Sequence, residues 1–368
     1  MEQQSEMEIM GLEQILRKNY SGKKVFITGH TGFKGAWLVS LLDSMGASVK
    51  GYALSPQKND LYHLIDGNKL CRSETGDIRN EKKLKNTIIK FNPDYIFHLA
   101  AQSLVRTSYE KPLYTYEVNA LGTANILNAA QGLNKKCSII IVTTDKVYDN
   151  SEKNYFYKEE DRLGGYDPYS ASKVCAEIIT DSFRNSYSSS LNNKGIASAR
   201  AGNVIGGGDW SNDRIIPDII KALQKNKPVV LRNPDSVRPW QHVLDVLCGY
   251  LLLGIKLNSA PEKFSSAYNF GPAEKNKMTV EQLTKAAIKS FGKGKYKISK
   301  EHVALHEFST LQLDSSKARK ELQWHPAWDS RLSVEKTMEW YKKVFLNKAS
   351  ALSITRNQIE NYLQYFIS

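Results

Sequence analysis

The chain has 368 residues, of which 41% are hydrophobic, so it is long enough to bury a large core as one α/β unit or as two lobes. No hydrophobic run approaches the roughly 20 residues of a membrane span, and the acidic residues 1–6 lack the basic and then apolar order of a secretory signal. The net charge of +13 comes from scattered Lys and Arg, which indicates a lysine-rich surface or a small phosphorylated substrate more than nucleic acid. We therefore expect neither a membrane nor a nucleic acid as a partner.

The cysteines and histidines give no metal-binding pattern. Cys71, Cys137, Cys175 and Cys248 are widely spaced and form no Cys-x-x-Cys pair, which is typical of reduced thiols in a cytoplasmic protein. His302 and His306 have helical spacing, but no Glu follows the first histidine, so we interpret this pair as structural.

The first predicted elements are a buried strand over residues 24–28 and a helix that continues through residues 36–42. Gly29, Gly32 and Gly35 lie between them and also enclose Phe33 and Lys34. A strand, a glycine turn and a helix form the usual pyrophosphate site for a dinucleotide, because the glycines admit the phosphates and the helix N-terminus offers N–H groups. The spacing has two residues between the first two glycines, where the standard fingerprint has one.

Strand-like and helical segments then alternate along the chain, with strands expected at 25–28, 48–54, 95–99, 138–143 and 196–200. This alternation predicts an α/β fold with a Rossmann-type, doubly wound parallel sheet. Beyond residue 200, prolines and the Gly206–Gly208 run divide the chain into short elements. We expect a mainly nucleotide-binding domain over 1–200, a smaller substrate-binding lobe over 201–350 that crosses back to the sheet, and a helical extension over 351–368.

Two polar groups of residues are candidates for catalysis. Thr144, Asp145 and Lys146 follow a predicted strand, where ligands of parallel sheets bind, although turn chemistry alone explains such residues. Tyr169 and Lys173 share a helical face, so the ammonium can favour the ionised phenol, although this spacing is also common on solvated helices. Ionising the tyrosine at neutral pH takes about three pKa units, or roughly 4 kcal/mol.

Several motifs together resemble the extended short-chain dehydrogenase/reductase superfamily, and within it the nucleotide-sugar 4,6-dehydratases, over nearly the whole chain. Residues 145–150, 206–210 and 238–243 are most similar to the subgroup that acts on CDP-glucose. The full set that carries the resemblance is Gly29–Gly35, Asp77, Ile78, residues 98–102, Asn119, residues 144–146, Tyr169, Lys173 and residues 200–203.

The resemblance implies a lyase that oxidises the sugar, eliminates water and reduces the product, for the synthesis of deoxysugars of surface polysaccharides such as the O-antigen of lipopolysaccharide. Tyr169 would take the 4-hydroxyl proton, with Lys173 lowering its pKa and holding the nicotinamide ribose, and Thr144 would bond O4. Asp145 would protonate the departing 6-hydroxyl. Lys146 would either remove the C5 proton or, still charged, stabilise the enolate.

The resemblance also implies the binding residues. NAD is the expected cofactor, although residues 55–58 include no acidic residue to select it and leave NADP open on the residues alone. The substrate would contact Gln102, Ser103, Asn203, Arg214 and Arg238, although Arg214 could equally be a surface residue of the following helix. The cofactor would contact Gly29, Gly32, Phe33, Lys34, Gly35, Asp77, Ile78, Leu99, Ala100, Gln102, Asn119, Tyr169 and Lys173.

Other functions remain open. A dTDP- or GDP-sugar dehydratase would share every chemical step, and a nucleotide-sugar epimerase would share the oxidation without the elimination. A catalytically silent nucleotide-binding regulator would not need Thr144, Tyr169 and Lys173 together. We expect a homodimer or homotetramer, with Val174, Ile178 and Ile179 packing either against another subunit or in the core of their own chain.

Overall fold

The structure is a computed structural model and describes residues 11–150, 155–187, 193–272, 277–299 and 311–365. Residues 1–6 and the pair His302 and His306, on which two predictions from the sequence rest, lie outside the described residues.

A seven-stranded, wholly parallel sheet forms the centre of the fold, in the order β12-β7-β5-β4-β1-β2-β3. Its strands are β1 (Lys24–Thr28), β2 (Ser48–Ala53), β3 (Arg72–Thr75), β4 (Tyr95–His98), β5 (Cys137–Val142), β7 (Lys194–Ala201) and β12 (Ala267–Phe270). The strand order reverses between β1 and β4, where Thr28 pairs with His98. This confirms the predicted doubly wound parallel sheet.

Two strands of this sheet are absent from the sequence-based prediction. β3 is largely exposed and polar, so it carries no apolar run that would mark it as a strand. β12 has four buried residues and follows the short helix α12 (Pro261–Phe264), in the region that proline and glycine divide. It pairs with β7 and brings the C-terminal part of the chain back to the sheet.

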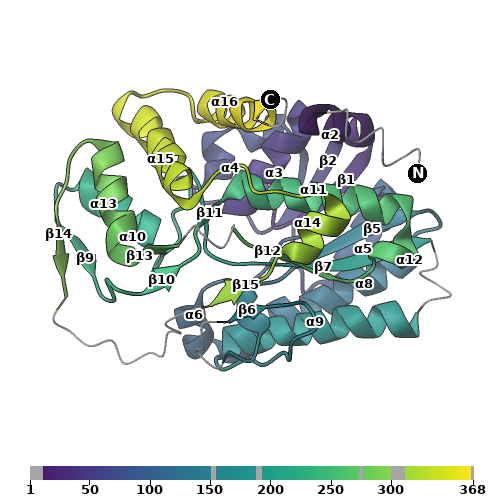
Figure 1. The fold of residues 1–368 in the computed structure, drawn as a ribbon. Coiled ribbons are helices and arrows are strands. Elements are labelled where there is room, and N and C mark those ends of the chain that lie inside the picture. The colour runs from purple at the N-terminus through teal and green to yellow at the C-terminus, as the bar shows by residue number, and fades with distance from the viewer. Residues whose placement is uncertain (1–10, 151–154, 188–192, 273–276, 300–310, 366–368) are drawn as a thin grey trace.

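Helices cover both faces of the sheet because successive strand residues point to opposite sides (Figure 1). Phe26 packs with the helices of one face, and its neighbours Val25 and Ile27 pack with those of the other. The Phe26 face is covered by α5 (Glu81–Phe91), α8 (Gly122–Gln131) and α9 (Pro168–Ser186). The opposite face is covered by α2 (Leu12–Tyr20), α3 (Phe33–Ser44) and α11 (Val243–Ser259), with α16 (Ala351–Gln364) packed outside them.

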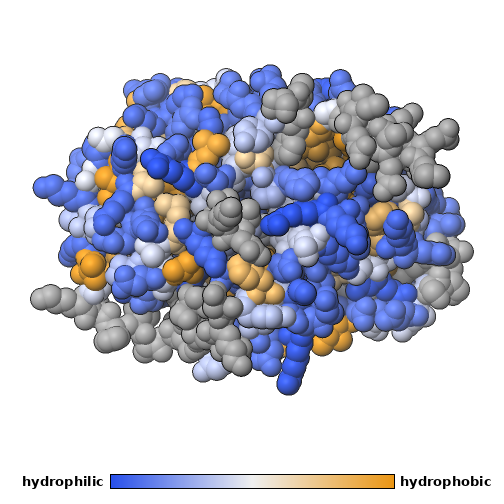
Figure 2. All heavy atoms as spheres, in the orientation of Figure 1, coloured by the Kyte–Doolittle hydropathy of each residue, from blue (hydrophilic) through white to orange (hydrophobic). Residues whose placement is uncertain are grey.

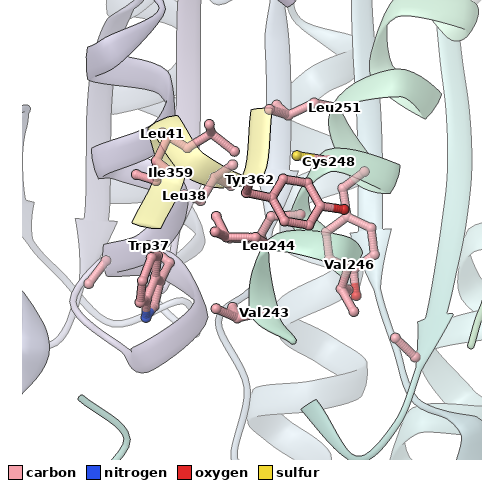
Figure 3. Close-up of a cluster of buried hydrophobic side chains, with 14 of the residues drawn as sticks. Trp37, Leu38, Leu41, Val243, Leu244, Val246, Cys248, Leu251, Ile359 and Tyr362 are labelled. Atoms are coloured by element: carbon pink, nitrogen blue, oxygen red, sulfur yellow. The ribbon is translucent and has the colours of Figure 1, made fainter. Parts of the chain in front are cut away.

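The main core lies where α3, α11 and α16 meet, and Figure 3 shows Trp37, Leu244 and Tyr362 from these three helices together. Tyr362 is fully buried and donates a hydrogen bond to Oδ1 of Asp245 at 2.7 Å. Helix α16 therefore holds to α11 through both apolar contact and a buried hydrogen bond.

The chain beyond β7 also builds a smaller group of elements at one end of the sheet, on the left of Figure 1. It contains α10 (Ile215–Gln224), α13 (Val280–Phe291), the parallel pair β9 (Val229–Leu231) and β14 (Tyr296–Ile298), and the antiparallel pair β10 (Val237–Arg238) and β13 (Met278–Thr279). The remaining elements are α4 (Leu61–Leu64), α6 (Val105–Glu110), α7 (Pro112–Tyr116), β6 (Phe156–Tyr157), β8 (Val204–Ile205), β11 (Gln241–His242), β15 (Gln312–Leu313), α14 (Ser316–Leu322), α15 (Ser330–Tyr341) and the short turns Gly67–Lys69, Glu117–Leu121, Asp145–Val147 and Lys342–Leu346.

On the face drawn in Figure 2, hydrophobic residues occur in separate spots among hydrophilic ones. Among the described helices, none combines the length and the apolar character that a membrane crossing needs.

Candidate active site

A pocket with a volume of about 670 Å³ lies at the carboxyl ends of the sheet strands and extends toward α10 and β9. It includes the point between β1 and β4 where the strand order reverses, which is where open α/β sheets bind ligands. The pocket lining brings together most residues that the sequence singles out. They are Gly29, Gly32, Phe33, Lys34, Gly35, Asp77, Ile78, Leu99, Ala100, Ser103, Thr144, Asp145, Lys146, Tyr169, Lys173, Asn203, Arg214 and Arg238.

Gln102 and Asn119 are the two predicted site residues that do not line this pocket. They bond to each other behind its wall: the Gln102 backbone N–H donates to Asn119 Oδ1 at 2.8 Å, and Asn119 Nδ2 donates to the Gln102 carbonyl at 3.0 Å. Asn119 also donates to Ser172 Oγ on α9 at 2.8 Å. Both residues are buried, so they brace the loop after β4 against α9 instead of facing the pocket.

The glycine turn after β1 has the shape that a pyrophosphate needs. Gly29 has a φ of +73°, and a Cβ there would lie 2.7 Å from the Ala100 backbone nitrogen. A Cβ at Gly35 would lie 2.2 Å from the Gly29 carbonyl oxygen, so this position also needs glycine. Gly32 is exposed at the N-terminus of α3, where its backbone can approach a ligand. A dinucleotide fits this cradle.

The extra residue in the turn has a structural explanation. His30 is fully buried, its Nε2 lies 2.7 Å from Ser73 Oγ, and its ring packs edge-on against Tyr62. Burial is the main cause that lowers the His30 pKa to about 4, so the imidazole is neutral. The histidine therefore supports the turn from below and points away from the pocket.

Helix α9 presents Tyr169 and Lys173 to the pocket, and both are more than nine-tenths buried. The Asp167 carboxylate caps the helix by accepting from the Ser170 backbone N–H at 2.9 Å. Lys173 Nζ donates to the Val142 carbonyl at the end of β5 at 3.0 Å. The solvated-helix alternative is therefore wrong for this pair.

Burial sets the pKa values of both groups. It raises the Tyr169 pKa to about 12, although a hydrogen bond with Thr144 opposes the rise. Without a ligand, burial therefore outweighs the groups that favour the phenolate. Burial also lowers the Lys173 pKa to about 8, and the negative charge of Glu177 opposes that fall. A positive ring beside the phenol would add the missing attraction for the phenolate.

Thr144, Asp145 and Lys146 leave β5 in a single helical turn that carries them into the pocket. Thr144 Oγ1 donates to Asp145 Oδ1 at 2.9 Å, and Asn203 Nδ2 lies 3.5 Å from Asp145 Oδ2. A Cβ at Gly202 would lie 1.9 Å from Asp145 Oδ2. Glycine at 202 therefore leaves the space that the Asp145 carboxylate fills.

Cationic groups gather beside the carboxylates at the middle of the pocket. Arg214 Nη1 donates to Asp209 Oδ2 at 2.9 Å, and its Nη2 donates to Ser103 Oγ at 3.3 Å. Arg214 thus lies at the start of α10 with its guanidinium in the pocket. The Lys34 pKa is lowered to about 7 by burial and by the positive charges of Arg214 and Lys173. An anionic group, such as a phosphate, would relieve this crowding of positive charge.

Sequence reasoning missed two buried carboxylates that hold these groups. Glu177 is four residues beyond Lys173, so helical spacing was an available signal. Asp209 fixes Arg214, but nothing local in the sequence shows that Asp209 is buried. Within the described residues, no group of three or more His, Cys, Asp or Glu side chains is arranged to hold a metal ion.

Comparisons with known proteins agree with this geometry. The family model described as GDP-mannose 4,6 dehydratase matches residues 26–337. The chain is 42% identical to the CDP-glucose 4,6-dehydratase of Salmonella typhimurium over 355 residues, covering 95% of this chain and 99% of the relative. It is 26% identical to the CDP-paratose 2-epimerase of Salmonella typhi over 350 residues, covering 87% of this chain and 100% of that one.

Solved structures show the same fold at low sequence identity. An epimerase from Methanothermobacter thermautotrophicus has a TM-score of 0.78 at 23% identity, covering 94% of this chain and 97% of its own. A dTDP-glucose 4,6-dehydratase from Bacillus anthracis, in complex with NAD, has a TM-score of 0.72 at 23% identity, covering 88% of this chain and 98% of its own.

Proposed function

The chain belongs to the GDP-mannose 4,6 dehydratase family, and we propose that it is an NAD-dependent lyase that converts CDP-D-glucose to CDP-4-dehydro-6-deoxy-D-glucose and water. The relative that is 42% identical over nearly the full length of both chains acts on CDP-glucose by its name, which supports this substrate. The product would feed the synthesis of deoxysugars for surface polysaccharides such as the O-antigen of lipopolysaccharide.

One observation carries the proposed reaction: a single pocket holds groups for oxidation and groups for elimination side by side. Tyr169 and Thr144 suit the oxidation of a hydroxyl, and Asp145 with Lys146 suits the transfer of protons during the loss of water. An epimerase needs only the first pair. The geometry therefore favours a dehydratase over an epimerase.

The first half of the reaction uses Tyr169, Thr144 and Lys173. Tyr169 as phenolate takes the proton of the sugar 4-hydroxyl, while Thr144 holds O4 through its hydroxyl. When bound, NAD would supply the hydride chemistry for oxidation at C4 and reduction at C6, and it would be regenerated over the whole reaction. Lys173, which donates to the Val142 carbonyl, would hold the nicotinamide ribose and add positive charge near the phenol.

The second half uses Asp145 and Lys146. The 4-ketone makes the C5 hydrogen acidic, and Lys146 either removes that proton as a neutral amine or stabilises the enolate as a cation. Asp145 gives a proton to the 6-hydroxyl, which leaves as water, and C5 regains a proton, from the base that removed it, when hydride is added at C6. Thr144 hydrogen-bonds to Asp145 and to Tyr169, so it links the two halves of the site.

The experiment is to incubate the purified protein with NAD and, separately, CDP-, UDP-, dTDP- and GDP-glucose, and to measure the products by mass spectrometry. We expect loss of one water from CDP-glucose, at a kcat/KM about tenfold above that of the other nucleotides. Better turnover of dTDP- or GDP-glucose would support the dehydration reaction and contradict the assignment of cytosine as the nucleobase of the substrate. An isomer of unchanged mass would indicate an epimerase.

We also propose that the protein is a homodimer or a homotetramer, with α9 at an interface between copies. Ile178 on α9 is 58% exposed, and Leu113 and Leu121 on the neighbouring segments are 77% and 57% exposed. Val174 and Ile179 pack against hydrophobic clusters of their own chain, so for these two positions core packing holds and not packing against another subunit. Light scattering of the protein and of Ile178→Glu is the test: a monomeric wild-type protein would contradict the proposal.

A cytoplasmic location completes the proposal. Cys71, Cys137 and Cys248 are buried free thiols, and Cys175 is a partly buried one. Free thiols persist in a reducing compartment. The substrate, a nucleotide sugar, is expected in the same compartment.

A further inference from the structure

The pocket continues beyond the catalytic groups along one face of α10. Arg214 precedes the first residue of this helix and Asp218 follows one turn later, with the Asp218 backbone N–H bonded to the Arg214 carbonyl at 3.0 Å. Both residues line the pocket. One helical turn spans about 5.4 Å, so a ligand whose phosphates lie at Arg214 reaches Asp218 with the group beyond its ribose.

The far end of the pocket combines apolar walls with a charged edge. Pro217, Val230 and Val280 contribute to the apolar lining. Arg232 lies between two carboxylates, with its Nη2 at 3.6 Å from Asp213 Oδ1 and at 4.0 Å from Asp218 Oδ2. Apolar faces and a polar edge are what a nucleobase requires: its ring stacks, and its edge is read by hydrogen bonds.

The two carboxylates at this edge differ in how far they are already engaged. Asp213 Oδ1 is shared by Arg232 and by Arg106, which lies at 3.4 Å. Asp218 has one ion pair among the described residues, at 4.0 Å, so its oxygens remain open as acceptors for a ligand. Burial raises the Asp218 pKa from its ordinary value, as expected for a carboxylate that lacks a close partner.

We propose that Asp218 determines the nucleobase by accepting a hydrogen bond from the exocyclic amino group of cytosine, while Arg232 donates to a cytosine ring acceptor. This inference rests on the proposed function, because it places the diphosphate of a nucleotide sugar at Arg214. Cytosine presents an amino donor where uracil and thymine present a carbonyl oxygen. That oxygen would face the Asp218 carboxylate without a proton between them, so uridine and thymidine nucleotides bind more weakly.

The test measures binding instead of turnover. Isothermal titration of the NAD-loaded protein with CDP, UDP and dTDP gives the ratio of the dissociation constants. We expect CDP to bind about tenfold more tightly than UDP or dTDP to the wild-type protein. In Asp218→Asn the side-chain amide can both donate and accept hydrogen bonds. The ratio of the dissociation constants should therefore come close to one, partly because UDP binds more tightly. Asp218→Leu should weaken CDP and leave UDP little changed.

Asp213→Asn is the matched control, because Asp213 carries the same charge in the same pocket and its φ of +58° suits asparagine. It should change the affinities for all three nucleotides alike and leave their ratio as in the wild type. A ratio that persists in Asp218→Asn, or equal weakening of CDP and UDP by Asp218→Leu, would overturn the proposal. The latter result would indicate a contact with ribose.

Failure of the proposed function gives a different pattern. If the wild-type protein dehydrates no nucleotide sugar but binds CDP selectively through Asp218, the reaction is wrong and the nucleobase assignment stands. If it dehydrates CDP-glucose and the Asp218 variants keep its selectivity, the assignment of Asp218 alone is wrong.

Discussion

The Glu177 carboxylate lies one helical turn beyond Lys173 on α9 and forms a buried ion pair with Arg200 of β7, at 2.9 Å. Both side chains are at most 5% exposed. Hydrogen bonds from Ser198 and Thr143 help Arg200 to hold the Glu177 pKa low against the burial that raises it. A fixed negative charge therefore lies within the core beneath the lysine of the active site.

Replacing Glu177 by Gln should destabilise the protein strongly, because the Arg200 cation would stay buried without its partner. We expect a loss of about 3–5 kcal/mol in the free energy of unfolding, measured by urea denaturation. The control is Asp181→Asn on the same helix. The Asp181 carboxylate pairs with Arg184 but is itself exposed, so this substitution should lower the free energy of unfolding by about 1 kcal/mol or less. The double variant Glu177→Gln with Arg200→Met should recover part of the loss. Equal effects of the two single variants would contradict a special role for Glu177.

Tyr169→Phe should abolish the oxidation of the sugar and leave cofactor binding largely intact. In the proposed mechanism the phenol takes part in the chemistry, whereas the glycine turn would hold the pyrophosphate. The measurement is the near-ultraviolet absorbance of reduced nicotinamide after mixing with CDP-glucose, together with titration of NAD by fluorescence quenching. Undiminished turnover would remove Tyr169 from the mechanism.

Asp145→Asn and Lys146→Met should separate the two halves of the reaction. Both variants keep Tyr169, Lys173 and Thr144, so the sugar should still be oxidised and the reduced nicotinamide should accumulate. Release of water, followed by mass spectrometry, should fall about 100-fold or more, since proton transfer by a placed side chain contributes on that order. Loss of the initial absorbance change would assign these residues to oxidation instead.

Gly202→Ala should disable the elimination without unfolding the protein. A Cβ at 202 would overlap Asp145 Oδ2, so the carboxylate would have to leave the place where Thr144 and Asn203 hold it. Gly132→Ala is the control, because its new Cβ would come closest to the flexible end of Ile89, at 3.0 Å, and would make only ordinary contact with the Ala129 carbonyl oxygen, at 3.5 Å. The comparison is kcat for both variants at equal melting temperature, and equal kcat values would show that Asp145 needs no such space.

Asp245 should make stability depend on pH. Burial raises its pKa to about 7, so the folded protein binds a proton that the unfolded chain releases near pH 4. Stability from this group is full below pH 4 and is lost as pH rises through about 7, on the order of 4 kcal/mol in total. Asp245→Asn should remove this decline. The melting temperature of the variant, relative to that of the wild type, should therefore rise between pH 5 and pH 8. A parallel pH dependence of both proteins would refute the assignment.

Local patterns were enough to predict the centre of the fold. Five strands and the glycine turn can be recognised from short runs of neighbouring residues. The spacing of four residues between Tyr169 and Lys173 matches the helix period, so it indicates a shared helical face. β3 was missed because its residues are polar at an exposed edge. The boundaries of the two expected domains remain a prediction.

The electrostatics of the site could not be predicted in this way. The spacing of Lys173 and Tyr169 suggested a lowered phenol pKa, but the desolvation that raises it depends on every segment that encloses the pocket. Asp209 and Arg232 likewise reach the pocket only when separate loops fold together, so the motif at residues 206–210 does not show that Asp209 is buried against Arg214, and no motif contains Arg232. Helix periodicity does place Glu177 one turn beyond Lys173, on the same face of α9.

The edge strand β12 follows its neighbour β7 by more than 60 residues in the chain, and this separation affects folding during synthesis. All eight residues of β7 are buried, and β7 bonds to β5 on one side and to β12 on the other. During synthesis, β7 leaves the ribosome before β12, so one row of its amide and carbonyl groups has no strand beside it until residue 270 has emerged. A bare edge of this kind invites pairing with another nascent chain. Fragments that end before β12 should therefore aggregate, and codon changes that slow translation between residues 202 and 266 should lower the yield of native protein.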